Sequence, residues 1–208
     1  DKAIELGLSG IAITDHESLS AHMTVNQYAK KIKEKYPNFK IALGNEIYLT
    51  DDRSTGQKYY HFILIAKDAI GYRALKENLY IDRKMERVPL LKSELKPIAE
   101  KYKGHLIATT ACIGGELGTC LLKAVEYREQ ENSYELYQTL KQIDTFLTFC
   151  QDLFGEDFYL EIAPSTAADQ KLVNHMIYKI GRSYGIKVEV ATDSHYLTKE
   201  DRPIHKAY

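Results

Sequence analysis

The sequence has few cysteines, no long apolar run and no recognisable leader, and each of these shortages excludes a class of protein. Only three cysteines occur among 208 residues, with no C-x-x-C pair, which argues against a disulfide framework and for a reducing compartment. No stretch approaches the roughly 20 consecutive apolar residues of a membrane span. The first residues lack the basic flank, apolar run and cleavage site of a signal peptide. We therefore expect a cytoplasmic protein without membrane contact.

An excess of charge of either sign is also missing. The chain has 28 basic and 29 acidic residues, which gives a net charge of −1. A domain that held nucleic acid mainly by neutralising phosphates would usually be clearly basic. Any contact with a polynucleotide is therefore expected to be local, through a metal or a small patch, or to depend on a neighbouring domain.

Linker-like segments are absent as well. Only five prolines are spread along the chain, and no charge block, low-complexity segment or internal repeat is present. Hydrophobic residues make up 44% and charged residues 27%, which is typical of a globular protein. We expect residues 1–208 to form a single domain. Because the chain opens without an initiator Met, in what looks like the middle of a helix, we expect an N-terminally truncated fragment of a larger chain.

Predicted strands alternate with predicted helices along the chain. Short apolar runs indicate strands over residues 9–14, 39–49, 59–66, 105–109, 158–162 and 186–191. Helical spacing and capping residues indicate helices over residues 19–36, 68–82, 91–102, 114–128, 131–153 and 167–184. This alternation predicts parallel βα units of the α/β class, hence a doubly wound sheet or, as we favour, a barrel.

Side chains that bind metals fall where the predicted strands end. They are Asp15, His16, Glu46, Cys112, Glu161, Asp193 and His195. In a βα barrel the carboxyl ends of the strands open on one face, so these side chains form a candidate metal-binding rim. His61 lies instead at the start of its strand, and it can reach the rim only if that strand runs antiparallel to its predecessor.

The chemistry of this set favours a transition metal. Imidazole, carboxylate and thiolate together bind zinc, manganese or iron rather than calcium. Two such metals can activate a water molecule and stabilise the leaving oxygen of a phosphoester. The sequence has no phosphate-binding G-x-x-x-x-G-K-[ST] loop, no G-x-G-x-x-G fingerprint and no G-x-S-x-G elbow, so no competing chemistry has comparable support.

Each residue also has a plainer interpretation. Cys112 alone, after a buried strand, would more often be a small core residue. Asp193 and His195 alone would more often be a loop pair, and His61 is as readily a core histidine. Glu46 in an apolar strand is harder to explain structurally, because burying an unpaired carboxylate is costly.

Several conspicuous side chains are given structural roles. His22, His105 and His175 do not lie at the carboxyl end of a predicted strand. Tyr134 and Tyr137 follow helical spacing and are expected in the core rather than on a surface that stacks bases.

In this order, the segments resemble the PHP (polymerase and histidinol phosphatase) domain, and most closely the version at the N-terminus of the alpha subunit of bacterial DNA polymerase III. The matching segments are residues 12–16, 44–48, 61–68, 106–112, 158–161 and 190–197. Gly71-Tyr72 after the third segment, and 114–116 after the fourth, favour the polymerase branch over free-standing phosphatases.

The resemblance implies a distorted, TIM-like (β/α)7 barrel with up to three divalent metal ions, zinc, manganese or iron. Carried over by motif, the metal ligands are His16, Glu46, His61, Cys112, Asp193 and His195, of which Asp193, His195 and Glu46 are also assigned catalytic roles. Asp15 is expected to orient the site as an outer partner, and Glu161 to buttress the rim. By this resemblance, the family's opening His-x-His motif and an acidic ligand just after it would precede Asp1.

The resemblance also implies a function in DNA replication. The parent chain would be a DNA-directed DNA polymerase, a nucleotidyltransferase of the bacterial cytoplasm, and this domain a metal-dependent 3′–5′ exonuclease. Its partners would be DNA, reached through the parent polymerase, and other replisome subunits, including a proofreading subunit. Two alternatives stay open: a stand-alone phosphoesterase of the histidinol-phosphatase type, and a non-catalytic structural or docking domain of the polymerase.

Overall fold

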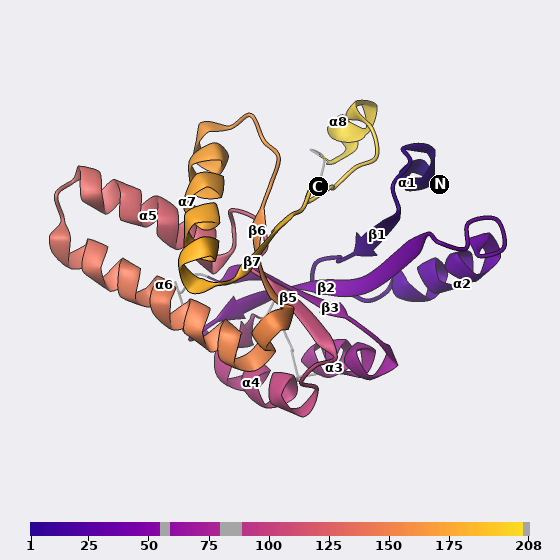
Figure 1. The fold of residues 1–208 in the computed structure, drawn as a ribbon, viewed down its shortest axis with the longest axis horizontal. Coiled ribbons are helices and arrows are strands. Elements are labelled where there is room, and N and C mark those ends of the chain that lie inside the picture. Colours follow the sequence, from indigo (N-terminus) through magenta and orange to yellow (C-terminus); the bar gives the residue numbers. More distant parts are fainter. Residues whose placement is uncertain (55–58, 80–88, 206–208) are drawn as a thin grey trace.

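The computed structural model describes residues 1–54, 59–79 and 89–205, and it is built on one curved sheet with helices packed around it (Figure 1). The helices are α1 Lys2–Glu5, α2 His22–Ile32, α3 Ala69–Leu79, α4 Lys92–Lys101, α5 Glu116–Glu129, α6 Ser133–Phe154, α7 Ala168–Tyr184 and α8 Arg202–His205, with 3-10 turns η1 Gly155–Asp157 and η2 Lys199–Asp201. The strands are β1 Gly10–Ile13, β2 Lys40–Thr50, β3 Tyr60–Ala66, β4 Leu90–Leu91, β5 Leu106–Thr109, β6 Phe158–Ile162 and β7 Lys187–Val190. Among these helices none is both long and apolar enough to cross a membrane.

The sheet is a half-barrel with one reversed strand. Its order is β1-β2-β3-β5-β6-β7, and β4 pairs with β2. Every pair is parallel except the two that β3 makes, since β3 runs antiparallel to both β2 and β5. The α/β class and the distorted barrel are confirmed, and β3 has the antiparallel direction that His61 needs to reach the rim. The connection over residues 51–59 is too short to carry a crossover helix, so the chain must return in the opposite direction.

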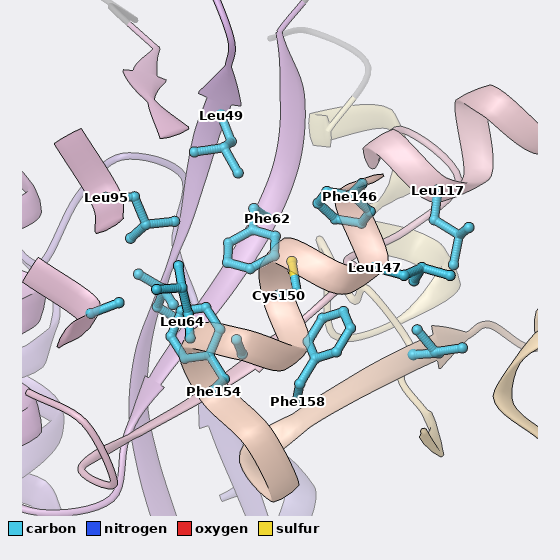
Figure 2. Packing of buried hydrophobic residues seen from close by; sticks show 14 of the residues in the cluster. Leu49, Phe62, Leu64, Leu95, Leu117, Phe146, Leu147, Cys150, Phe154 and Phe158 are labelled. Carbon is cyan, nitrogen blue, oxygen red and sulfur yellow. The ribbon is translucent and has the colours of Figure 1, made fainter. Parts of the chain in front are cut away.

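The two faces of the sheet carry different side chains, because successive residues of a strand point to opposite sides. On β3, Phe62 and Leu64 are almost completely buried against the helices. The ring of Phe62 lies 6.3 Å from that of Phe146 and 6.1 Å from that of Phe154, both on α6 (Figure 2). The alternate residues Ile63 and Ile65 of β3 line a cleft, to which neighbouring strands contribute the polar side chains of Glu46, Thr109 and Glu161.

The tyrosines at the start of α6 are a correction to the expected core. Tyr134 is 70% exposed and Tyr137 63% exposed. At 3.6 residues per turn they lie about 180° and about 120° around the helix axis from the buried Ile143, so they point away from the core. The first turns of α6 also extend past the sheet together with α5 (Figure 1). A repeated spacing of three residues predicted the helix correctly, but it drifts off the buried face.

Helix boundaries differ slightly from the expected ones. The helix expected over 19–36 is continuous only over α2, and its N-cap is Ala21, which makes no side-chain cap. Ser18 hydrogen-bonds with Ser20 instead of capping the helix. The last residues of the helix expected over 68–82 lie outside the described residues.

Replacing Phe62 with Ala tests the core. Loss of this ring, which is 1% exposed, should lower the free energy of unfolding by about 3–5 kcal/mol, since a cavity remains between β3 and α6. Urea unfolding monitored by circular dichroism measures the change. The matched control is Tyr137→Ala, an exposed ring whose loss should change stability by no more than about 0.5 kcal/mol. Equal losses for both variants would contradict the assignment of the core.

Candidate metal centre

The reversal of β3 brings His61 to the rim. Tyr48 of β2 pairs with His61 of β3, so the first residues of β3 lie beside the carboxyl-terminal half of β2. Isolated bridges connect His16 to Glu46 and His61 to Gly115. The antiparallel direction on which the position of His61 depended is therefore present.

Two imidazoles and a carboxylate converge at this point. The ligand atoms of His16, Glu46 and His61 all lie within 4.8 Å of one another. His61 Nδ1 is 2.5 Å from Glu46 Oε1, and His16 Nδ1 is 3.6 Å from Glu46 Oε2. Glu46 is buried, and its Oε1 accepts no well-aligned hydrogen bond. A buried carboxylate oxygen that lacks a well-aligned hydrogen bond and lies beside two imidazoles is suited to bind a divalent cation such as zinc, manganese or iron.

Cys112 adds a thiol to this group. Its Sγ lies 3.6 Å from His61 Nδ1, on the turn between β5 and α5. The Cys112 thiol and the Glu46 carboxylate raise the pKa of His61 to about 10, against the opposing effect of burial. Without a metal the His61 imidazole is therefore protonated at neutral pH, and a cation would replace that proton beside Glu46 and Cys112.

The segment after β7 brings a third imidazole to the rim. The ring of His195 lies 5.8 Å from that of His16. His195 Nδ1 is 2.9 Å from the backbone oxygen of Asp193 and 3.6 Å from its Oδ1. A carbonyl oxygen can only accept, so Nδ1 carries the hydrogen and Nε2 carries the lone pair that can bind a metal.

The backbone of the rim is strained next to the predicted ligands. Four non-glycine residues in the described ranges have a positive φ, and three of them are Glu17 (51°), Ala111 (58°) and Asp193 (46°). Each such residue costs on the order of 1–2 kcal/mol, and such residues cluster at functional sites. The conformation at Glu17 is held by two hydrogen bonds to β2, from Glu17 N to Glu46 O (2.9 Å) and from Tyr48 N to Glu17 Oε1 (3.0 Å).

Asp15 contacts β2 through its backbone. Its carbonyl oxygen accepts hydrogen bonds from Glu46 N at 3.2 Å and from Asn45 Nδ2 at 2.7 Å, while its side chain is exposed. These bonds extend the pairing of the β1 segment with β2 as far as His16 and Glu46. Asn45, which sequence reasoning did not select, thus fixes the segment that carries His16.

Tyr48 is a second residue that sequence reasoning missed. Its ring is almost completely buried and lies 5.8 Å from the His16 ring and 5.3 Å from the His61 ring. It limits the orientations of both imidazoles. The available signal was its spacing of two from Glu46, which places both side chains on the same face of β2.

A pair of carboxyl groups lies deeper on the same face. Glu161 of β6 and Glu189 of β7 are opposite each other in the register, and Glu161 Oε2 accepts a hydrogen bond from Thr109 Oγ1 at 2.9 Å. Burial raises the pKa of Glu161 to about 7; the Thr109 hydrogen bond opposes this, and the carboxylates of Glu189 and Asp193 add to it. Burial also raises the pKa of Glu189, which sequence reasoning missed.

These groups share one cleft of about 670 Å³, a volume in the range of small-molecule sites. The two ends of the sheet, β1 and β7, both contribute to its walls, and Ile63 and Ile65 of β3 form part of its apolar lining. The predicted site residues that line it are Asp15, His16, Glu46, Cys112, Glu161, Asp193 and His195. His61 adjoins it through Glu46 and Cys112.

Three histidines lie away from this cleft. His22 is buried beside Tyr72, with a ring distance of 5.7 Å, and His175 is exposed on α7. His105 Nδ1 is 2.7 Å from Asp68 Oδ2, next to the start of α3. None of them contributes to the rim.

Comparison with known proteins gives one family. The model of the PHP domain matches residues 1–165. A probable DNA polymerase of Bacillus subtilis (strain 168), YorL, is 36% identical over 225 residues, which cover 99% of this chain and 17% of the relative. The DNA polymerase III alpha subunits of Borreliella burgdorferi and Aquifex aeolicus are 31% and 28% identical over 96% and 98% of this chain, and 16% and 17% of their own lengths. The chain therefore spans about a sixth of the length of these curated relatives.

The raised pKa of Glu161 predicts a pH-dependent stability of the metal-free chain. The ordinary pKa of an unfolded Glu is about 4.3. Below that pH, the raised pKa of Glu161 makes its full contribution to the stability of the folded state. This contribution is lost as the pH rises through 7. The free energy of unfolding should fall by about 2 kcal/mol between pH 5 and pH 7 from this group. Urea unfolding in the presence of a chelator measures it.

The comparison is with Glu161→Gln, which should lack this part of the pH dependence. Glu156→Gln, at a carboxylate whose side chain is 91% exposed, is the control and should keep it. The same pH dependence in wild type and Glu161→Gln would show that Glu161 titrates normally.

Proposed function

The chain belongs to the PHP domain family, and on this premise we propose that it is the PHP domain of a bacterial-type replicative DNA polymerase, with a metal centre that removes nucleotides from the 3′ end of DNA. We propose that residues 1–208 form this one domain within a longer chain. The family match ends at residue 165, but β7 pairs with β6 in the same sheet and the segment after β7 supplies Asp193 and His195.

The observation that carries this proposal is the convergence of ligands from distant parts of the chain. His16, Glu46 and His61 approach within 4.8 Å, Cys112 lies 3.6 Å from His61, and the His195 ring lies 5.8 Å from the His16 ring. Such a donor set suits zinc, manganese or iron, and a purely structural role would not require it.

The protein's own groups have distinct tasks in this proposal. Glu46, His16 and His61 hold the cation, with Cys112, Asp193 and His195 completing the set. When bound, a divalent cation activates water and offsets the charge that develops on a phosphoester. Glu161, whose pKa is about 7, can take up or release a proton within the cleft near neutral pH.

The substrate class follows from the relatives and from the charge of the chain. The relatives are named DNA polymerases, which suggests DNA as the substrate. A net charge of −1 provides no general attraction for phosphates, so the rest of the polymerase would have to deliver the strand end to the cleft. Other replisome subunits are the partners expected for such a protein, and the bacterial cytoplasm is its expected location.

The test is Asp193→Asn in the natural full-length protein. Asn tolerates the positive φ of 46° at this position, so the substitution removes the charge without straining the backbone further. Trimming of a labelled primer in manganese or zinc should fall by about 100-fold or more. Extension of the same primer with deoxynucleoside triphosphates should continue, and bound metal is measured by elemental analysis.

The control is Asp152→Asn, at an exposed position on α6, which should trim normally. Unchanged trimming by Asp193→Asn would contradict the exonuclease. A wild-type protein that holds no metal and trims no primer would instead support a structural or docking role. Hydrolysis of small phosphomonoesters without trimming would support the phosphoesterase alternative.

A further inference from the structure

A buried ion pair lies behind the turn that carries Cys112. Lys92 is the first residue of α4 and Glu116 the first of α5. Lys92 Nζ lies 2.9 Å from Glu116 Oε2 and 3.0 Å from Asp51 Oδ2. Glu116 is 1% exposed, and its Oε1 accepts a further hydrogen bond from Gln142 Nε2 at 2.9 Å.

The contact between Lys92 and Glu116 affects the pKa of both side chains. Burial raises the pKa of Glu116, and the Lys92 ammonium opposes that rise. Burial alone would lower the pKa of Lys92, but the carboxylates of Glu116 and Asp51 outweigh it and raise the pKa. A buried ion pair gives little net stability relative to apolar side chains of the same volume, yet removing one partner is costly. Overall stability therefore does not explain why the Lys92–Glu116 ion pair lies next to the Cys112 turn.

The Cys112 turn enters α5 directly at Glu116, the first residue of that helix. Gly115 N donates to Cys112 O at 2.8 Å, and His61 N donates to Gly114 O at 3.3 Å. A side chain at Gly115 would place its Cβ 2.0 Å from the backbone oxygen of Thr110, so the turn is as tight as a glycine allows. These backbone hydrogen bonds hold the turn directly against His61, and Glu116 is the next residue along the chain.

The contacts of this ion pair extend to the segments that carry Glu46 and His61. Asp51 directly follows β2, the strand of Glu46. Tyr60 directly precedes His61, and its side chain hydrogen-bonds with Gln142, the residue that also binds Glu116. One network therefore connects the segments that carry Glu46, His61 and Cys112.

We propose that Lys92 and Glu116 are positioning residues that hold the Cys112 thiol beside His61, and thereby complete the metal centre. The thiol-holding role stands on the contacts above. Its relevance to metal binding rests on the proposed function.

The first measurement is Co²⁺ binding by the natural full-length protein, followed through the thiolate-to-cobalt absorption band. Glu116→Gln and Lys92→Met each break the ion pair with little change in volume. Either variant should bind Co²⁺ about tenfold more weakly and lose most of this band. The control is Val173→Ala, a fully buried position on α7 whose truncation lowers stability without touching the network. It should keep both affinity and band.

The second measurement does not depend on metal. In a chelator, hydrogen exchange followed by mass spectrometry should be about tenfold faster in peptides spanning residues 110–117 of Glu116→Gln and Lys92→Met, while peptides of β6 stay unchanged. Val173→Ala should not produce this local increase. Using two variants keeps the test decisive if one of them fails to fold.

The outcomes separate the two proposals. Unchanged exchange at 110–117 together with unchanged Co²⁺ binding in the variants would overturn the positioning role. Faster local exchange in the variants, with no Co²⁺ bound by wild type, would support the positioning of the thiol and contradict the metal-dependent function.

Discussion

A parallel βα barrel presents ligands only from the carboxyl ends of its strands, and β3 runs the other way between β2 and β5. This reversal places the first residues of β3 where its neighbours end, so that His61 lies between Glu46 and the Cys112 turn. The remaining features of the centre follow from that placement: the bridge from His61 to Gly115, the buried Glu46 and the ring of Tyr48 against both imidazoles. With β3 parallel, His61 would lie at the opposite end of the sheet.

Much of this arrangement could be predicted from local sequence pattern, because strand ends and helix periods are local properties. The strand over Phe158–Ile162 and the helix ending at Tyr184 have the expected boundaries. The direction of β3 is a property of the connection to its neighbour, and apolar spacing does not encode it. Tyr137 is exposed because a repeated spacing of three residues drifts around the helix and leaves the buried face of α6. The position of Glu189 in the cleft follows from its register opposite Glu161, which the spacing of residues in β7 does not encode.

The rim illustrates how a fold sustains unfavourable local conformations. Ala111 and Asp193 adopt positive φ without the freedom of glycine, at positions directly next to Cys112 and two residues before His195. Hydrogen bonds beside Ala111 compensate there: Ala111 N donates to Thr109 Oγ1, and Thr110 Oγ1 accepts from Glu161 N. The strained conformation at Ala111 is thus supported by contacts between the β5 and β6 segments, and it orients the neighbouring Cys112.

The predicted ligands of the candidate metal centre span the chain from His16 to His195, and this has a kinetic consequence. Contacts between residues so distant in sequence form only after large loops have closed, which is slow relative to the formation of α6 or of the β2–β3 pair. No partly folded intermediate that lacks the β6–β7 pairing can hold the full set of donors. A cation held by the full predicted set would therefore bind the completed fold more tightly than any precursor that lacks β7, and would stabilise the last step of folding.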